Sequence, residues 1–309
     1  MAIRSFEQLK YEATWLGPKR LAIAAAANAE SLAAACDAQA LGMAHCILVD
    51  DKNKLTQLAE RHEIDIADMT LVDIPDSQDA ARTVMQMARA GEADVIMKGA
   101  LETAVFLRAA LDRDTGLRSG KLFTHVAIFE IPGFDRLLLL SDGGVVMTPD
   151  IYQKMEIVQN AIDVALKIGI ERPKVAILAA SELVDPRVPT TLDAANLSKM
   201  AERGQIRGGV VDGPLALDNA ISENSAQIKG IASSVAGHAD ILIVPDVEAG
   251  NLVAKAITYF GHAEMAGVVV GGCVPMVVTS RSDSHTSKLV SMALGILLMT
   301  AGCQPVRLR

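Results

Sequence analysis

The fold is decided by three stretches of the chain, Asp212-Gly-Pro-Leu-Ala-Leu-Asp-Asn-Ala220, Pro245-Asp-Val-Glu-Ala-Gly-Asn251 and Thr279-Ser-Arg-Ser-Asp-Ser284. Each follows a short β-branched run that is typical of a buried strand, and each carries the small and polar residues of a strand-to-helix turn. In an open α/β sheet such turns line the crevice where ligands bind. The three stretches therefore predict an α/β sheet with a ligand site along these turns.

Strand and helix patterns alternate along the N-terminal part of the chain. Strands are expected at residues 20–26, 45–50, 69–73 and 94–98, and helices at 28–41, 52–62, 77–90 and 101–111. This βαβα order predicts a parallel sheet with right-handed crossovers.

The alternation breaks in the middle of the chain. Two strands around Pro132-Gly133 predict an antiparallel hairpin at residues 125–130 and 136–141. Beyond it we expect a domain boundary, then a helix at 152–167, strands at 174–179, 209–211, 240–244, 267–270 and 276–280, and helices at 192–203 and 252–262. The nearly all-apolar segment 283–300 predicts a buried helix that packs back on the first domain. The predicted α/β domains are therefore 1–148 with 268–309, and 149–267.

Composition narrows the function classes. The formal net charge of −8 over 309 residues argues against nonspecific nucleic-acid binding, which depends on Lys and Arg. The most apolar stretch, residues 289–301, is shorter than the roughly 20 apolar residues that span a bilayer, so no membrane association is expected. The cysteines, Cys36, Cys46, Cys273 and Cys303, show neither a C-x-x-C pair nor zinc-site spacing. A cytoplasmic protein with reduced thiols is the prediction.

The stretch Thr279-Ser-Arg-Ser-Asp-Ser284 offers the clearest chemistry. Ser282 or Asp283 is suited to cap the free N–H groups of the helix that follows. A helix N-terminus favours an anion, and an arginine fork beside it, here Arg281, makes a phosphate or oxyanion site. Asp283 next to such a site is a candidate general base. A plain helix cap is the alternative interpretation of the same residues.

The other stretches and two basic segments add candidate ligand contacts. Gly250 allows a close backbone approach, Asn251 can cap the next helix, and Lys255 lies one turn further on the same helix face. Asp212 and Asp218 are left near a strand end by the Gly-Pro turn between them. The remaining candidates follow a strand, lie in a basic loop or start the last helix: Lys98, Arg118, Ser119 and His285. A capped turn or a solvated loop also explains each place, and both interpretations stay open.

Together these motifs resemble those of the phosphate acetyl/butyryl transferase family. The resemblance rests on Met97-Lys98-Gly99, Arg118-Ser119-Gly120, Ser141-Asp142-Gly143-Gly144 with Pro149, Asp212-Gly-Pro-Leu-Ala-Leu-Asp218, Pro245-Asp-Val-Glu-Ala-Gly-Asn251 and Ser280-Arg281. The combination is specific, although no single element is. The run Ser-Arg-Ser-Asp-Ser-His-Thr-Ser from Ser280 and the compact length are more similar to the butyryl branch. Acetyl and butyryl both remain open as the acyl group.

The resemblance implies a phosphate acyltransferase. Such an enzyme reversibly converts acyl-CoA and inorganic phosphate to acyl phosphate and free CoA, without a further cofactor or a metal. It also implies two α/β domains with the site in the cleft between them, a fold shared with the isocitrate and isopropylmalate dehydrogenases, and a homodimer. Carried onto this sequence, the catalytic residues would be Ser280, Arg281 and Asp283. The substrate-binding residues would be Lys98, Arg118, Ser119, Asp212, Asp246, Gly250, Asn251, Lys255 and His285.

Two other function classes stay open at the level of sequence. A metal-dependent hydroxy-acid dehydrogenase of the related fold would hold a divalent ion with clustered carboxylates. Its candidate ligands would be Asp212, Asp218, Asp246 and Glu248. A non-catalytic acyl-CoA-binding regulator is the other alternative, and the complete catalytic set in this chain argues against it.

Overall fold

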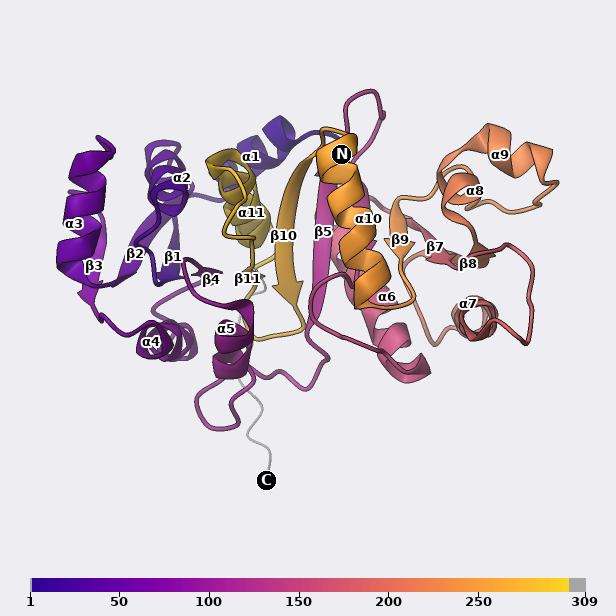
Figure 1. The fold of residues 1–309 in the computed structure, drawn as a ribbon, viewed down its shortest axis with the longest axis horizontal. Coiled ribbons are helices and arrows are strands. Elements are labelled where there is room, and N and C mark those ends of the chain that lie inside the picture. The colour runs from indigo at the N-terminus through magenta and orange to yellow at the C-terminus, as the bar shows by residue number, and fades with distance from the viewer. Residues whose placement is uncertain (1, 300–309) are drawn as a thin grey trace. The chain divides into compact units, whose positions relative to one another are not determined.

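The computed structural model of the protein describes residues 2–299 (Figure 1). The chain divides into two compact units. We call Leu122–Met265, together with Met1–Ser5, the central unit, and Phe6–Lys121, together with Ala266–Arg309, the flanking unit. Both are mixed α/β units, as the alternating sequence pattern predicts.

The described residues of the flanking unit form six strands: β1 (Lys19–Ala24), β2 (Ala44–Asp50), β3 (Thr70–Asp73), β4 (Val95–Lys98), β10 (Glu264–Val270), which enters the unit at Ala266, and β11 (Met276–Val277). Their order is β3-β2-β1-β4-β11-β10. All neighbours in this order are parallel except β10 and β11, which are antiparallel. The predicted parallel βα series is therefore confirmed, and β11 places the end of the chain beside β4.

The helices of the flanking unit are α1 (Phe6–Trp15), α2 (Ala29–Ala40), α3 (Lys52–Arg61), α4 (Ser77–Ala90), α5 (Thr103–Ala110) and α11 (His285–Leu297). Figure 1 shows α1, α2 and α11 on one side of the strands and α4 and α5 on the other. The apolar α11 is buried along most of its length and packs against α1 and α2, as expected. Thr300, which the predicted helix included, lies outside the described residues.

The strands of the central unit are β5 (Thr124–Glu130), β6 (Leu138–Ser141), β7 (Lys174–Leu178), β8 (Val210–Leu215) and β9 (Ile241–Ile243), in the order β5-β6-β9-β7-β8. Strands β5 and β6 form the predicted antiparallel hairpin. The helices are α6 (Ile151–Lys167), α7 (Pro189–Glu202), α8 (Leu217–Ile221), α9 (Glu223–Ile228) and α10 (Val247–Phe260). Leu140, Leu242 and Leu215 are members of the buried core of this unit.

The compact units differ in their bounds from the predicted domains, 1–148 with 268–309 and 149–267. The contacts place Leu122 and the β5–β6 hairpin in the central unit, because β6 pairs with β9 and α6 packs against both hairpin strands. The assignment of domains itself stays a prediction.

One local expectation was wrong, and one helix was not predicted. The Gly213-Pro214 segment was predicted to turn after a strand, but β8 continues through it to Leu215. Pro214 lacks an N–H, and it is accommodated because β8 is at the edge of the order and its register with β7 shifts between Ala176 and Leu178. Helix α1 was not predicted, because its polar and apolar residues show only a weak helical pattern.

Two further expectations concern membrane-spanning helices and the cysteine thiols. None of the helices in residues 2–299 combines the length and the apolar character needed to cross a bilayer. Cys36 and Cys46 are free thiols, and burial raises the pKa of Cys46 to about 12, which keeps it protonated and unreactive. Cys303 lies outside the described residues.

Candidate phosphate site at the start of α11

Between β11 and α11 the chain forms a tight turn closed by Asp283. The Asp283 carboxylate accepts the backbone N–H of Ser280 at 2.7 Å, and the Asp283 N–H donates to the carbonyl oxygen of Ser280 at 3.2 Å. The hydroxyls of Ser280 and Ser282 lie 3.0 Å apart and share a hydrogen bond. The prediction that Ser282 or Asp283 caps the helix was wrong, because the helix begins at His285 and Ser284 is its cap.

The N-terminus of α11 is filled by the protein's own groups. The Ser284 hydroxyl accepts the N–H of Ser287 at 3.1 Å, and the N–H of His285 donates to the carboxylate of Glu30 at 2.7 Å. The imidazole of His285 lies 3.5 Å from the carboxylate of Asp37. Both carboxylates come from α2, so His285 joins α11 to α2. Attraction for an anion near this turn must therefore come chiefly from side chains rather than from open helix N–H groups.

Those side chains are cations. Lys98, at the end of β4, is only 2% exposed, and its ammonium donates to the carbonyl oxygens of Gly99 at 3.3 Å and Leu101 at 3.2 Å. Burial, and then the positive charges of Arg281 and Lys288, lower the pKa of Lys98 to about 8. Asp283 acts in the opposite direction but is the weakest of these influences. The three cations Lys98, Arg281 and Lys288 thus lie near the turn, which contributes one carboxylate, that of Asp283.

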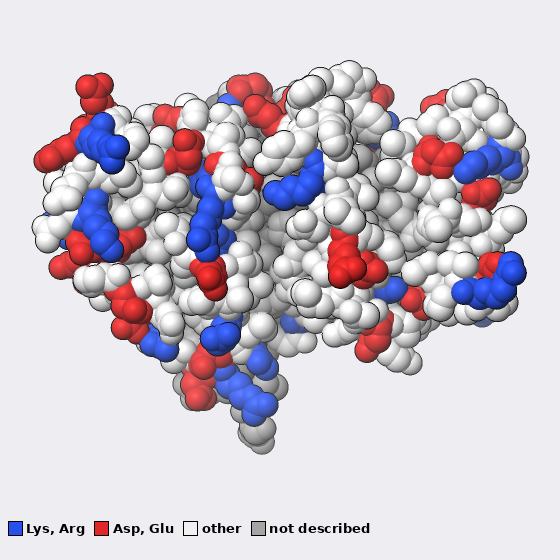
Figure 2. Space-filling model, in the orientation of Figure 1, with Lys and Arg blue, Asp and Glu red and all other residues white. Residues whose placement is uncertain are grey.

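We call this group of five residues the turn cluster: Lys98, Ser280, Arg281, Asp283 and Lys288. Arg281 is exposed, whereas the two lysines are buried. Figure 2 shows basic side chains gathered over the β11–α11 connection, although acidic and basic residues alternate elsewhere on this face. A concentration of positive charge beside a hydroxyl-rich turn is suited to a phosphate group.

Sequence reasoning missed Lys288. It was overlooked because it lies within an apolar helical run, where a lysine is expected to extend to solvent. The local signal was available, since Lys288 lies four residues after the Ser284 cap and on the same helix face. Its burial, at 2% exposure, could not be read from the pattern.

Two other predicted residues, Arg118 and Ser119, anchor the basic loop to the β10–β11 connection. The Ser119 hydroxyl donates to the carbonyl oxygen of Gly271 at 2.5 Å, and Arg118 forms an isolated antiparallel bridge with Gly272. The guanidinium of Arg118 also donates to the carbonyl oxygen of Leu111 at 2.6 Å. These contacts give both residues a structural role in the flanking unit.

Apart from Asp212, which lies in β8, the predicted substrate-binding residues of the central unit lie on α10 or at its N-cap. Asp246 caps this helix by accepting the N–H of Ala249 at 2.8 Å, so the expectation that Asn251 is the cap was wrong. Asn251 and Lys255 instead lie inside the helix with exposed side chains, and the Lys255 ammonium lies 6.0 Å from the centre of the Tyr259 ring. Polar groups on one helix face remain available for a ligand.

Gly250 makes the close backbone approach that its position predicts, but the partner is protein. A Cβ on Gly250 would lie 2.6 Å from the Cα of Gly143. Gly143 belongs to a turn that Asp142 holds, because the buried Asp142 carboxylate accepts the backbone N–H groups of Gly144 and Val145 at 2.8 and 2.9 Å. Two motifs far apart in the sequence are thus joined by packing.

Of the four carboxylates proposed for a divalent ion, Asp212, Asp218 and Asp246 are separately engaged. Asp212 accepts the N–H of Gly213 at 2.8 Å, Asp246 caps α10, and Asp218 pairs with Lys229 at 3.0 Å. Within the described part of the chain, no group of three or more His, Cys, Asp or Glu is placed to hold a metal ion.

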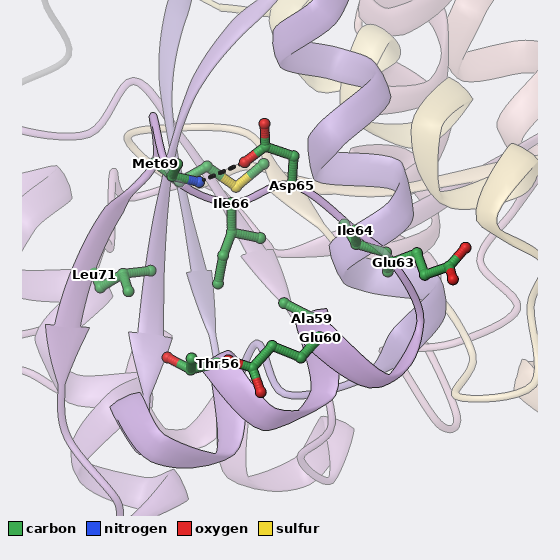
Figure 3. A pocket seen from close by; sticks show the side chains of 10 residues that line it. Thr56, Ala59, Glu60, Glu63, Ile64, Asp65, Ile66, Met69 and Leu71 are labelled. Atoms are coloured by element: carbon green, nitrogen blue, oxygen red, sulfur yellow. Dashed lines mark hydrogen bonds between the residues drawn. The ribbon is translucent and has the colours of Figure 1, made fainter.

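A surface hollow of about 520 Å³ lies beside α3 and β3 (Figure 3). Its lining is mostly apolar, and its charged residues, Glu60, Glu63 and Asp65, are all acidic. It contains none of the predicted site residues. Such a lining repels phosphate, so the turn cluster is the better candidate for an anionic substrate.

An α/β sheet with Lys98, Arg281 and Lys288 near the turn beyond β11 is typical of proteins that bind phosphate groups. Residues 77–296 match the family model described as "Phosphate acetyl/butaryl transferase". The chain is 44% identical over 296 residues to a phosphate butyryltransferase of Clostridium acetobutylicum, with 96% of this chain and 98% of the relative covered. It is 45% identical over 267 residues to a phosphate acetyltransferase of Rhizobium meliloti, with coverage of 86% and 84%.

A solved structure agrees with these relatives. The branched-chain phosphotransacylase from Enterococcus faecalis superimposes with a TM-score of 0.78 at 30% identity, covering 91% of this chain and all of that one. The chain therefore belongs to the phosphate acetyl/butyryl transferase family, and it is an acyltransferase. Neither the dehydrogenase nor the non-catalytic regulator is favoured by these findings.

Proposed function

We propose that the turn cluster binds inorganic phosphate, and the phosphoryl group of acyl phosphate in the reverse reaction. The observation that carries this proposal is the placement of Lys98, Arg281 and Lys288 around one turn that contributes a single carboxylate. Like charges held close together repel one another, and a bound dianion would relieve that repulsion. Arg281, the exposed member, offers a planar fork that matches two phosphate oxygens.

The reaction proposed is a direct transfer between acyl-CoA and phosphate. A phosphate oxygen attacks the thioester carbon, so a C–O bond forms while the C–S bond breaks. The electron pair of the broken bond leaves on sulfur, which takes up the proton that phosphate gives up. Holding both substrates in one orientation supplies much of the acceleration. Arg281 and the Ser280 hydroxyl would stabilise the oxyanion of the tetrahedral state.

Asp283 is proposed to move the thiol proton. Its carboxylate already accepts the N–H of Ser280 at 2.7 Å, which fixes its position and leaves its other lone pairs for a substrate. In the direction of acyl-CoA formation it would take the proton from CoA as general base. The same hydrogen bond also gives Asp283 a structural role, so the two roles have to be separated by experiment.

The acyl group is proposed to be short, with acetyl and butyryl as the candidates. Relatives named for each are similarly identical to this chain. Candidate contacts to the CoA part are the remaining predicted residues, Arg118, Ser119, Asp212, Asp246, Gly250, Asn251, Lys255 and His285. Exposed polar groups at Asn251 and Lys255 support this assignment best.

Several broader features carry over as proposals. A dehydrogenase-like fold of two α/β domains, the first of them discontinuous, is supported by the two compact units. A cytoplasmic location is supported by the free thiols of Cys36 and Cys46. A homodimer and a reaction without cofactor or metal follow from the family resemblance.

One assay tests the proposed function. Release of CoA thiol is measured from acetyl-CoA and from butyryl-CoA, with and without phosphate, and with and without EDTA. Release that requires phosphate and is unaffected by EDTA is expected. Phosphate-independent release, or a complete loss with EDTA that Mg²⁺ or Mn²⁺ restores, would contradict the proposal.

A further inference from the structure

Lys288 is a buried lysine. Its surroundings are neither open solvent nor an ordinary surface ion pair, which are the usual surroundings of a lysine ammonium. It lies in the first turns of α11 and is only 2% exposed. Its ammonium donates to the carbonyl oxygen of Asp283 and, at 3.4 Å, to that of Ser280. Both acceptors are backbone carbonyls, so neither supplies a full negative charge. The acceptors are the first and last residues of the Ser280–Asp283 turn.

Burying this cation is unfavourable for folding. Burial lowers the pKa of Lys288, with Asp283 and then Glu30 acting in the opposite direction. An apolar residue at this point of a largely buried helix would avoid the desolvation of an ammonium group. The ammonium is stabilised in part by the negative charges of Asp283 and Glu30, and both of its hydrogen bonds go to the turn.

Those hydrogen bonds and the contact made by the Asp283 carboxylate together hold the two ends of the turn. The carboxylate of Asp283 holds the N–H of Ser280, and the ammonium of Lys288 holds the carbonyls at both ends of the turn. Arg281 lies between these two anchors and has an exposed side chain. The backbone of the turn that carries Ser280 and Arg281 is therefore held at both of its ends.

We propose that Lys288 is a positioning residue, which acts through the Ser280–Asp283 turn to orient Ser280 and Arg281 for phosphate. The inference rests on the proposed function of the turn cluster. Lys288 does not have to touch the substrate in this role. Its contribution is to reduce the number of turn conformations that the substrate would otherwise have to select.

The test combines Lys288→Met with a matched control. Lys154→Met removes another buried lysine, which is 7% exposed and pairs with Asp193 at 2.7 Å in the central unit. Hydrogen–deuterium exchange of the peptide covering the turn is measured without substrates, and kcat and the phosphate KM are measured with acetyl-CoA and butyryl-CoA. Lys288→Gln serves as a second variant, because it keeps N–H donors without the buried charge.

For Lys288→Met we expect faster exchange at the turn and a fall in kcat/KM for phosphate of about 10- to 100-fold. Lys288→Gln should show a smaller change in the exchange rate and in kcat/KM for phosphate. If Lys288→Met does not fold, the same two measurements on Lys288→Gln decide the test. Lys154→Met should lower thermal stability and leave both measurements unchanged. A similar loss in Lys154→Met would reduce the effect to general destabilisation and overturn the proposal.

Unchanged exchange at the turn in both Lys288 variants would show that the lysine does not hold it. Faster exchange with unchanged kcat and KM would show that the turn is held for stability alone, and would also overturn the proposal. The exchange measurement needs no substrate. If the wild-type protein released no CoA with phosphate, the proposed function would fail, while exchange would still decide whether Lys288 holds the turn.

Discussion

If Lys98 binds phosphate as proposed, phosphate binding should depend on pH in the range where activity is assayed. Its pKa is lowered from 10.5 to about 8, first by burial and then by Arg281 and Lys288. Below that value the ammonium is protonated and attracts a phosphate dianion. Above it the neutral amine no longer does, so the affinity for phosphate should fall as the pH rises through about 8.

The size of the effect follows from the pKa. Lys98 is mostly protonated at pH 7, and one unit above its pKa only about a tenth of it is protonated. A charge-assisted hydrogen bond contributes about 1.5–3 kcal/mol, so the neutral form should bind phosphate at least about tenfold more weakly. The phosphate KM should therefore rise about 5- to 9-fold between pH 7 and 9. The KM for acyl-CoA should change little over the same range.

Folding stability should move in the opposite direction. Because the folded pKa of Lys98 is lower than the unfolded value of 10.5, the unfolded chain binds a proton that the folded chain lacks between about pH 8 and 10.5. Wild-type stability should therefore rise over this window relative to Lys98→Met. The upper limit of this difference is about 3 to 4 kcal/mol, from about 1.4 kcal/mol for each pKa unit.

The assay is initial-rate CoA release at several phosphate concentrations from pH 7 to 9.5, with blanks for thioester hydrolysis. Lys98→Met is the control and should show a raised phosphate KM with no further rise above pH 8. Urea unfolding of both proteins at pH 7.5 and 9.5 measures the stability difference. A flat phosphate KM in the wild type, or the same rise in Lys98→Met, would refute the role of Lys98.

Three further predictions follow from single contacts. Arg281→Lys keeps the charge but loses the fork, so the phosphate KM should rise about tenfold with unchanged thermal stability; unaltered kinetics would move the phosphate site elsewhere. Asp283→Asn keeps an oxygen that can accept the Ser280 N–H but cannot take a proton, so kcat should fall about 100-fold if Asp283 is the general base. A near-normal kcat would show that Asp283 only holds the turn. Gly250→Ala should lower the free energy of unfolding by about 1–3 kcal/mol in denaturant titration, because its Cβ would lie 2.6 Å from Gly143; an unchanged midpoint would show that the backbones separate freely.

The sequence predicted the elements whose pattern is local. The βα series, the hairpin around Pro132-Gly133 and the buried final helix all follow from hydrophobic period and turn residues, and the structure contains each of them. The continuation of β8 through Gly213-Pro214 could not be predicted in this way. A proline in a strand is tolerated only at an edge or an irregularity, and strand order is set by tertiary pairing.

The same distinction applies to the site. Motif content gave Ser280, Arg281, Asp283 and Lys98, and the structure brings these into one cluster with Lys288. The roles of individual groups depended on contacts between distant segments. Glu30, for example, comes from α2 to accept the first N–H of α11, and nothing in the local sequence around it indicates that partner.

Gly250 shows how a correct local inference can miss its cause. The residue had to be glycine because another backbone comes close, and the sequence pattern predicted that approach. The other backbone is that of Gly143, more than one hundred positions earlier in the chain. A motif that suggested ligand contact is thus explained in part by packing within the central unit.

The most direct test of the central claim is a crystal structure of the protein with bound phosphate. The account predicts phosphate oxygens within hydrogen-bond distance of the Arg281 guanidinium and the Lys98 ammonium, with the Ser280 hydroxyl facing the same group. Phosphate bound at Arg118 or on the central unit, with no phosphate at the turn cluster, would contradict it.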